Sequence, residues 1–213
     1  MPDRLLTAIP PSGEYLESRF DVSARANTWV LFEPPDDVSW VGAFGNPGIA
    51  DYSDLVHFPH DANLVLVIAG AQGYIVDRRS GILLRQTRRD YCYAALPVPG
   101  SDRIVLADNT LIWCTSPTED AFARADSPLL KADDLNRVGL DGIVFLEVNP
   151  DRLLGAYESY DGWFSFTLEF SSMLVRRGPR VSKGQSGLMA DAGRGYPPTR
   201  LAIERALSFR LPA

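Results

Sequence analysis

Short runs of β-branched, aromatic and aliphatic residues recur along the chain, and each run ends near glycine, aspartate, asparagine or serine. The clearest group comprises residues 64–70, 74–77 and 82–85, which are separated by the turn-like segments 71–73 and 78–81. Apolar runs of this length with turn-forming residues between them are typical of strands joined in hairpins. This part of the sequence therefore predicts three consecutive antiparallel strands.

Two later groups and one earlier unit share this pattern. The later groups comprise residues 103–107, 110–114 and 121–124, and then 152–157, 162–168 and 173–176, while the earlier unit comprises 28–32 and 38–44. The matching positions Tyr74, Leu111 and Trp163 are 37 and 52 residues apart, so the repeat is irregular. We therefore predict a mainly-β fold, an irregular repeat of antiparallel strand-turn-strand units that forms a small propeller-like body or a sandwich.

The segment from Gly73 to Gly81 contains an aromatic residue, then valine and aspartate, and then a turn that ends in glycine. It resembles one blade of the β-propellers whose repeats have this order, although the chain lacks the Trp-Asp dipeptide of WD40 repeats. The resemblance implies antiparallel sheets stacked on one another. It covers this one group well and the two later groups loosely.

Helical patterns are scarce. Short helices are predicted at residues 12–19, where Ser12 is a suitable N-cap, and at residues 128–137. The clearest pattern predicts a short C-terminal helix at residues 199–209, which begins at Thr199 after two prolines and places four apolar residues on one side: Leu201, Ala202, Ala206 and Leu207. The preceding residues 178–195 have the glycine- and proline-rich composition of a linker.

The net charge of −6 hides a strong asymmetry along the chain. From Arg176 onward there are eight basic and two acidic residues, a net charge of +6, which leaves −12 for the rest. We therefore predict an acidic β-repeat domain at residues 1–175 and a basic, Gly/Pro-rich tail at residues 176–213. An acidic body repels the phosphates of nucleic acids and attracts cationic partners, whereas the simpler interpretation of the charge is solubility.

The composition also predicts where the protein resides. The longest apolar run, residues 64–71, is much shorter than the roughly 20 residues of a membrane-spanning helix. The N-terminal residues lack the pattern of a secretory signal, and the two cysteines, Cys92 and Cys114, are expected to be small buried side chains rather than a disulfide. With the strong preference for arginine over lysine, these features predict a cytoplasmic bacterial protein that does not bind membranes.

No motif for catalysis or cofactor binding is evident. A nucleophilic hydrolase needs a histidine base, and the chain offers only His57 and His60, in a segment that Pro59 interrupts. We interpret both as loop residues before the strand at Leu64, with a metal site that includes Asp61 as the alternative. The glycines at 42–48 lack the lysine and the helix of a phosphate-binding loop. The sequence therefore predicts no catalytic, cofactor or metal residues.

One cluster has the composition of a binding surface. Five residues at a predicted hairpin turn combine aromatic rings with carboxylates: Tyr157, Glu158, Tyr160, Asp161 and Trp163. Tyrosine and tryptophan carry much of the energy at protein interfaces, and the carboxylates suit a basic partner. The alternative is that Tyr157 and Trp163 face the core.

By its overall properties, the chain is similar to the bacterial immunity proteins and antitoxins, which are small, acidic and not catalytic. The resemblance implies a non-enzymatic module that binds and neutralises a basic protein, such as a toxin. Two alternatives remain. One is a carbohydrate-binding or carbohydrate-processing β-protein with an aromatic and carboxylate pocket, and the other is a subunit whose basic tail reaches an acidic partner.

Overall fold

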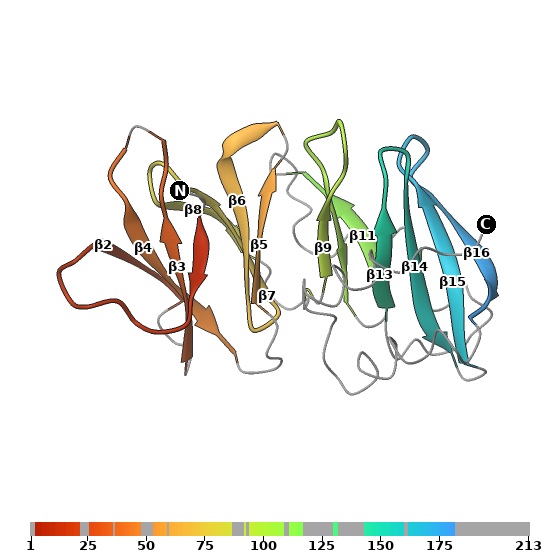
Figure 1. Ribbon diagram of the computed structural model, residues 1–213, viewed down its shortest axis with the longest axis horizontal. Coiled ribbons are helices and arrows are strands. Elements are labelled where there is room, and N and C mark those ends of the chain that lie inside the picture. Colours follow the sequence, from red (N-terminus) through yellow and green to blue (C-terminus); the bar gives the residue numbers. More distant parts are fainter. Residues whose placement is uncertain are drawn as a thin grey trace.

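The computed structural model describes residues 3–21, 26–35, 37–47, 53–58, 60–86, 92, 94–108, 111–116, 130–131, 143–159 and 162–181. Every regular element in these ranges is a β-strand, so the prediction of a mainly-β fold is confirmed. The sixteen strands form four sheets of four strands each, which lie side by side in chain order (Figure 1).

The first and second sheets are built from the N-terminal half of the chain. The first contains β1 (Arg4–Leu6), β2 (Leu16–Phe20), β3 (Ala26–Phe32) and β4 (Trp40–Asn46). The second contains β5 (Ser53–Phe58), β6 (Asp61–Ala69), β7 (Gln72–Asp77) and β8 (Ile82–Gln86).

The third and fourth sheets follow in the same way. The third contains β9 (Ala94–Pro97), β10 (Ile104–Ala107), β11 (Leu111–Thr115) and β12 (Leu130–Lys131). The fourth contains β13 (Ile143–Val148), β14 (Arg152–Ser159), β15 (Gly162–Glu169) and β16 (Leu174–Arg180).

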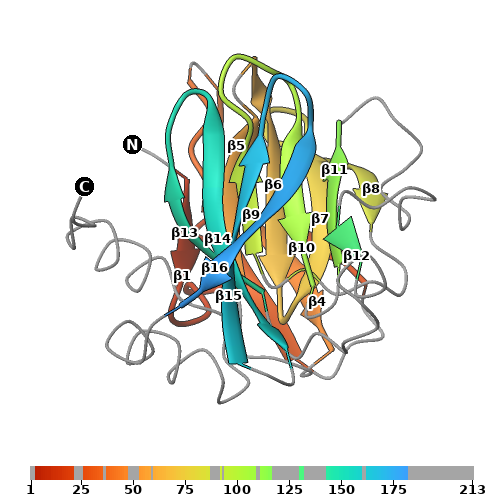
Figure 2. The same ribbon diagram turned by 90° about the vertical axis from the view of Figure 1, so that its right-hand side faces the viewer.

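Three of the sheets are simple antiparallel meanders, in which each strand pairs with the next one in the chain. In the second and third sheets, the first strands β5 and β9 lie toward one side of the stack and the last strands β8 and β12 toward the opposite side (Figure 2). Strand β5 contacts both β1 and β9, so the edges on the first side cover one another.

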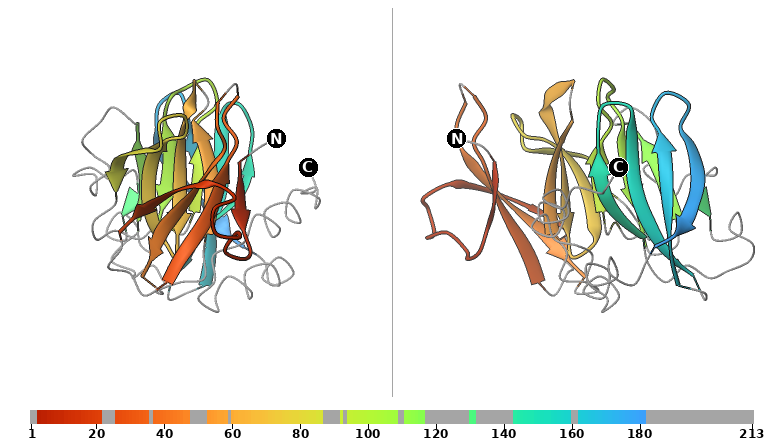
Figure 3. Two further views of the ribbon diagram at one scale, coloured as in Figure 1. Left: turned by 90° about the vertical axis from the view of Figure 1, so that its left-hand side faces the viewer. Right: turned by 45° about the vertical axis from the view of Figure 1, so that its right-hand side comes forward.

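The first sheet departs from this order, because its strands run β1-β3-β4-β2 and β2 is parallel to β4. The connection between β1 and β2 therefore crosses the sheet, on the face that points away from the second sheet (Figure 3). Leu6 and Tyr15 pack there against the buried side chains of Trp29 and Leu31. The N-terminal segment thus covers the apolar outer face of the first sheet.

A hydrophobic cluster fills each interface between neighbouring sheets. Strand β6 is buried on both faces, since Val65 and Val67 point toward the first sheet while Leu66 and Ile68 point toward the third. This double burial explains the uninterrupted apolar run in its sequence. Among the described residues no cluster joins the first sheet to the fourth, and these two sheets lie at opposite ends of the stack (Figure 1).

The central strands of the predicted groups are confirmed, but other predictions fail. Residues 12–19 were expected to form a helix, and instead β2 begins at Leu16 and gains its backbone hydrogen bonds from β4. In the second predicted helix, Leu130–Lys131 is strand β12, paired with β11. The predicted third strand at 121–124 and the C-terminal helix at 199–209 lie outside the described residues.

Strand β16 runs to Arg180 and so crosses the predicted boundary between residues 175 and 176. The first three arginines assigned to the basic tail, Arg176, Arg177 and Arg180, therefore belong to the fourth sheet.

In the described part of the chain, no helix has the length and apolar character that crossing a membrane requires.

Candidate functional site

The structure separates the aromatic residues of the predicted binding cluster. Tyr157 is 1% exposed, and its ring stacks on Phe164 with 5.8 Å between ring centroids, at the interface with the third sheet. Trp163 is the strand partner of Glu158 on the opposite face of the fourth sheet, where it packs against Val144 and Ala156. Tyr157 and Trp163 therefore share no surface.

The side chains of the other three residues of the predicted cluster are not described by the structure. The structure describes Glu158 by its backbone alone, and Tyr160 and Asp161 lie outside the described residues. The pKa of Tyr157 is raised by burial, an effect that the nearby charge of Arg177 opposes. The Arg177 guanidinium lies 4.4 Å from the centre of the Phe164 ring. Tyr157, Phe164 and Arg177 all belong to the fourth sheet, so these contacts lie within that sheet.

The interpretation of His57 as a loop residue is wrong, because it lies on strand β5, opposite Val65 of β6. The apolar residues Val56 and Phe58 on either side of His57 are buried against the third sheet. His60 lies in the tight turn that leads into β6. Across the ranges that the structure describes, no three histidine, cysteine or acidic residues are grouped so that they could hold a metal ion.

Neither Cys92 nor Cys114 forms a disulfide. Cys92 is fully buried between the second and third sheets, and its backbone N–H donates to the carbonyl oxygen of Ala71 at 2.7 Å. Cys114 is partly buried on the other face of the third sheet.

A highly connected polar group lies at the junction of the first and second sheets. It starts from the turn between β7 and β8, where the carboxylate of Asp77 accepts hydrogen bonds of 2.9 Å from the backbone N–H groups of Arg79 and Ser80. Gly81 has a positive φ of 69°, which glycine adopts without strain. The turn presents Arg78 toward the first sheet.

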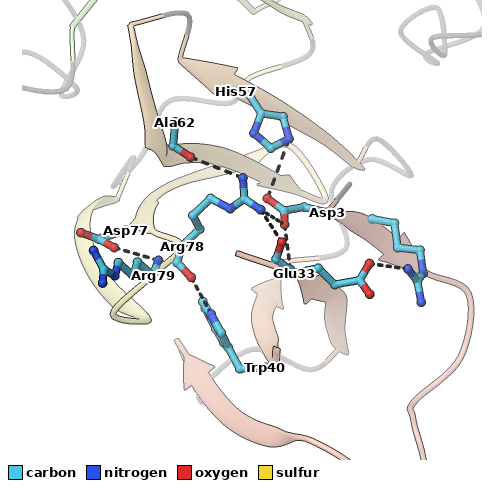
Figure 4. Close-up of polar contacts among 9 residues, drawn as sticks. Asp3, Glu33, Trp40, His57, Ala62, Asp77, Arg78 and Arg79 are labelled. Carbon is cyan, nitrogen blue, oxygen red and sulfur yellow. Dashed lines mark hydrogen bonds and ion pairs between the residues drawn. The ribbon is translucent and has the colours of Figure 1, made fainter. Parts of the chain in front are cut away.

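The Arg78 network consists of Asp3, Glu33, His57, Ala62 and Arg78 (Figure 4). The Arg78 guanidinium donates to Asp3 Oδ1 at 2.9 Å, to the Glu33 carbonyl at 2.8 Å and to the Ala62 carbonyl at 3.4 Å. Its own carbonyl accepts the indole N–H of Trp40 at 2.7 Å. Arg78 thus connects four parts of the chain: the residue before β1, the residue after β3, strand β4 and strand β6.

Asp3 is the anionic centre of the Arg78 network, and its carboxylate is fully buried. Its Oδ1 atom also accepts the backbone N–H of Glu33 at 2.9 Å. Its Oδ2 atom has no hydrogen-bond partner and lies 3.9 Å from Nε2 of His57, which is 44% exposed. Sequence reasoning missed Asp3 because its partners lie up to 75 positions away.

Three other arginines of the first two sheets also contact carboxylates. Arg4 contacts Glu33 at 2.7 Å, Arg19 contacts Glu17 at 2.6 Å and Arg79 contacts Asp37 at 3.3 Å. Residues 1–86, which include both sheets, contain eleven acidic and six basic residues, a net charge of −5. Residues 143–181, which include the fourth sheet, have five acidic and four basic residues, a net charge of −1. Residues 87–142, which include the third sheet, have nine acidic and six basic residues, a net charge of −3. The first two sheets are therefore more acidic than the fourth.

A surface hollow of about 420 Å³ lies between turns of the third and fourth sheets. Its lining includes Arg103 and Asp151 together with Phe170 and Met173. One positive and one negative side chain give it no net preference for a charged ligand.

Comparison with known protein families finds none whose sequence pattern matches this chain, and comparison with characterised proteins finds no significant sequence relative.

Proposed function

We propose that this chain is a non-enzymatic module that binds a basic protein surface, in the manner of an immunity protein or antitoxin that neutralises a toxin. The observation that supports this proposal is the uneven distribution of charge along the stack. In the first two sheets, four arginines contact carboxylates of the same two sheets, and an acidic excess remains. A surface of one sign steers an oppositely charged protein into contact and selects against other partners.

The partner proposed is a protein with an exposed cluster of lysine and arginine residues. Long-range attraction of this kind acts mainly on the association rate and weakens as salt screens the charges. The stack of sheets would act as a rigid support, since its interfaces are filled by buried aliphatic and aromatic side chains. The proposal assigns the binding surface to the first two sheets rather than to the predicted hairpin cluster of the fourth.

The experiment begins with a partner recovered from the native host and purified, whose binding to the full chain is measured by calorimetry and stopped-flow mixing. The test variant is Asp54→Asn with Asp61→Asn, two acidic residues of the second sheet. Asparagine keeps an oxygen that can accept the N–H of Leu55 or Asn63, and it removes the negative charge. The matched control is Glu147→Gln with Glu169→Gln in the fourth sheet.

The test variant is expected to slow association by on the order of tenfold at low salt, while the control changes it little. High salt should reduce the difference between the two variants. A partner whose association rate responds neither to salt nor to the second-sheet variant would overturn the proposal.

A further inference from the structure

We infer that strand β2 is a docking edge, along which an extended basic segment of a partner protein adds as a fifth strand of the first sheet. The inference rests on the proposed function and names the place and form of that contact. An extended peptide that pairs with a free sheet edge gains affinity from backbone hydrogen bonds and specificity from alternate side chains.

In the spatial order β1-β3-β4-β2, strand β2 lies at the edge of the first sheet and pairs with β4 on one side. Within the described ranges, no strand pairs with its other edge. Its register with β4 is regular over all five residues from Leu16 to Phe20. A straight edge without interruption offers alternating N–H and C=O groups to an incoming strand.

Two other edge strands, β16 and β8, are less suited to this role. Strand β16 contains Pro179, which has no N–H to donate, and three arginines that would repel a basic segment. The pairing of β8 with β7 is interrupted by a register shift, and irregular edges of this kind discourage further pairing. On the opposite side of the stack, β5 contacts β1 and β9.

The side chains along β2 match a partner with alternating apolar and basic residues. Leu16 is 68% exposed, the highest value for a large apolar side chain in the described residues. The register places Leu16 and Phe20 on the face of Trp40 and Phe44, and Glu17 on the opposite face. An added strand would therefore bring alternate residues beside Leu16 and beside Glu17.

The charges around β2 favour a basic segment. Glu14 precedes the strand, Glu17 lies within it and Asp21 follows it, against the single base Arg19 between residues 14 and 21. The charge of Glu14 is the main cause of a raised pKa at the adjacent Tyr15, which agrees with a negative potential at this edge.

The test measures binding of a labelled peptide of alternating lysine and valine to the full chain by fluorescence anisotropy at low salt. One comparison peptide has alternate backbone amides methylated, which retains charge and composition but removes donors on one edge. A second comparison peptide replaces lysine with aspartate. The inference expects both changes to weaken binding by on the order of tenfold or more.

Matched variants locate the contact. Leu16→Ser and Glu17→Lys are expected to weaken binding of the lysine–valine peptide by about tenfold each. The control for Leu16→Ser is Leu174→Ser, because Leu174 is likewise an exposed leucine at the start of an edge strand. The control for Glu17→Lys is Glu169→Lys, because the Glu169 side chain is 38% exposed, the Glu17 side chain is 39% exposed, and each pairs with an arginine. Both controls should leave binding unchanged.

Three outcomes would overturn the inference: equal binding of the methylated peptide, equal loss with the controls, or a dimer of the chain that Leu16→Ser abolishes. If a host partner responds to the Asp54 and Asp61 variant but not to Leu16→Ser or Glu17→Lys, the proposed function stands and the docking edge fails.

Discussion

The Arg78 guanidinium donates a hydrogen bond of 2.9 Å to Asp3 Oδ1, and the Asp3 carboxylate has no exposed surface. The pair joins the segment that enters β1 to the turn between β7 and β8, so it connects two sheets across their interface. Arg78 also binds the carbonyl oxygens of Glu33 and Ala62. A buried ion pair contributes to stability only while both members are present.

Substitution of Arg78 by methionine should therefore destabilise the protein strongly. It leaves the Asp3 carboxylate buried without a counter-charge, a defect that costs about 3–5 kcal/mol in the free energy of unfolding. The measurement is urea unfolding at neutral pH. The matched control is Arg79→Met, which removes an exposed pair with Asp37 and should cost no more than about 1 kcal/mol. Equal losses in the two variants would contradict a special role for Arg78.

Gly155 is required because of its neighbour Phe166. A Cβ atom at Gly155 would lie 2.2 Å from the Phe166 ring and 2.6 Å from the backbone oxygen of Val144. Gly155→Ala should therefore destabilise the fourth sheet by about 1–3 kcal/mol, as overpacking does in other cores. Thermal unfolding measures the effect. Phe166→Leu should cost less in the Gly155→Ala background than in the wild type, and simple additivity would show that the two positions do not clash.

Because the Tyr74 phenol is buried, we expect the protein to lose stability at high pH. Its hydroxyl group donates to the carbonyl oxygen of Gly45 at 2.7 Å, and burial, together with the charge of Asp21, raises its pKa above the ordinary value of 10.0. The folded state therefore favours the neutral phenol. The stabilisation is complete below pH 10 and falls as the pH rises above that value, because the unfolded chain then ionises while the folded one does not.

Urea unfolding between pH 8 and pH 11.5 tests this sign, with Tyr74→Phe as the comparison. The variant should cost about 1–2 kcal/mol at pH 8, where it leaves the Gly45 carbonyl without its donor, and should lose less stability than the wild type above pH 10. Parallel pH profiles for the two proteins would refute the assignment to Tyr74.

Two buried tryptophans should respond differently to the same change. The indole N–H of Trp40 donates to the Arg78 carbonyl, whereas that of Trp113, which is 2% exposed, has no hydrogen-bond partner. Replacement by phenylalanine removes similar volume at each site, but only Trp40→Phe leaves a carbonyl group without its donor. That variant should lose about 1–3 kcal/mol more than Trp113→Phe in chemical unfolding. A larger loss at Trp113 would contradict this reasoning.

The central strands were predictable because their local patterns are strong. Strands β6, β7 and β10 are rich in valine, isoleucine and leucine and end at turn residues, so that both the elements and their hairpins follow from the sequence. Strand β5 was not predicted, because it contains Asp54 and His57 among its apolar residues. Strand β9 is only four residues long and ends in proline, which gives an equally weak signal.

Where the local sequence pattern is weak, the strands with which a segment pairs determine its secondary structure. Residues 16–19 were predicted as part of a helix, yet β4 supplies the backbone hydrogen bonds of β2, and Phe20 at the end of β2 stacks on Phe44 at 4.8 Å. Tyr157 and Trp163 were predicted to share a site, but their positions in paired strands place them on opposite faces of the sheet. The face of the sheet on which a residue lies depends on the strand register. The register is set by the pairing of two strands and cannot be derived from one segment alone.

By itself, the sequence determined that this protein is built from β-strands joined by short turns, and that its charge is acidic over residues 1–175 and basic from residue 176 onward. The physical reason is that burial and turn formation depend on residues close together in the chain. Only the tertiary structure decided that Asp3 meets Arg78 and that, among the described residues, β2 pairs with a strand on one edge alone. Those relationships arise between sheets, where residues far apart in the chain come into contact as apolar faces are buried.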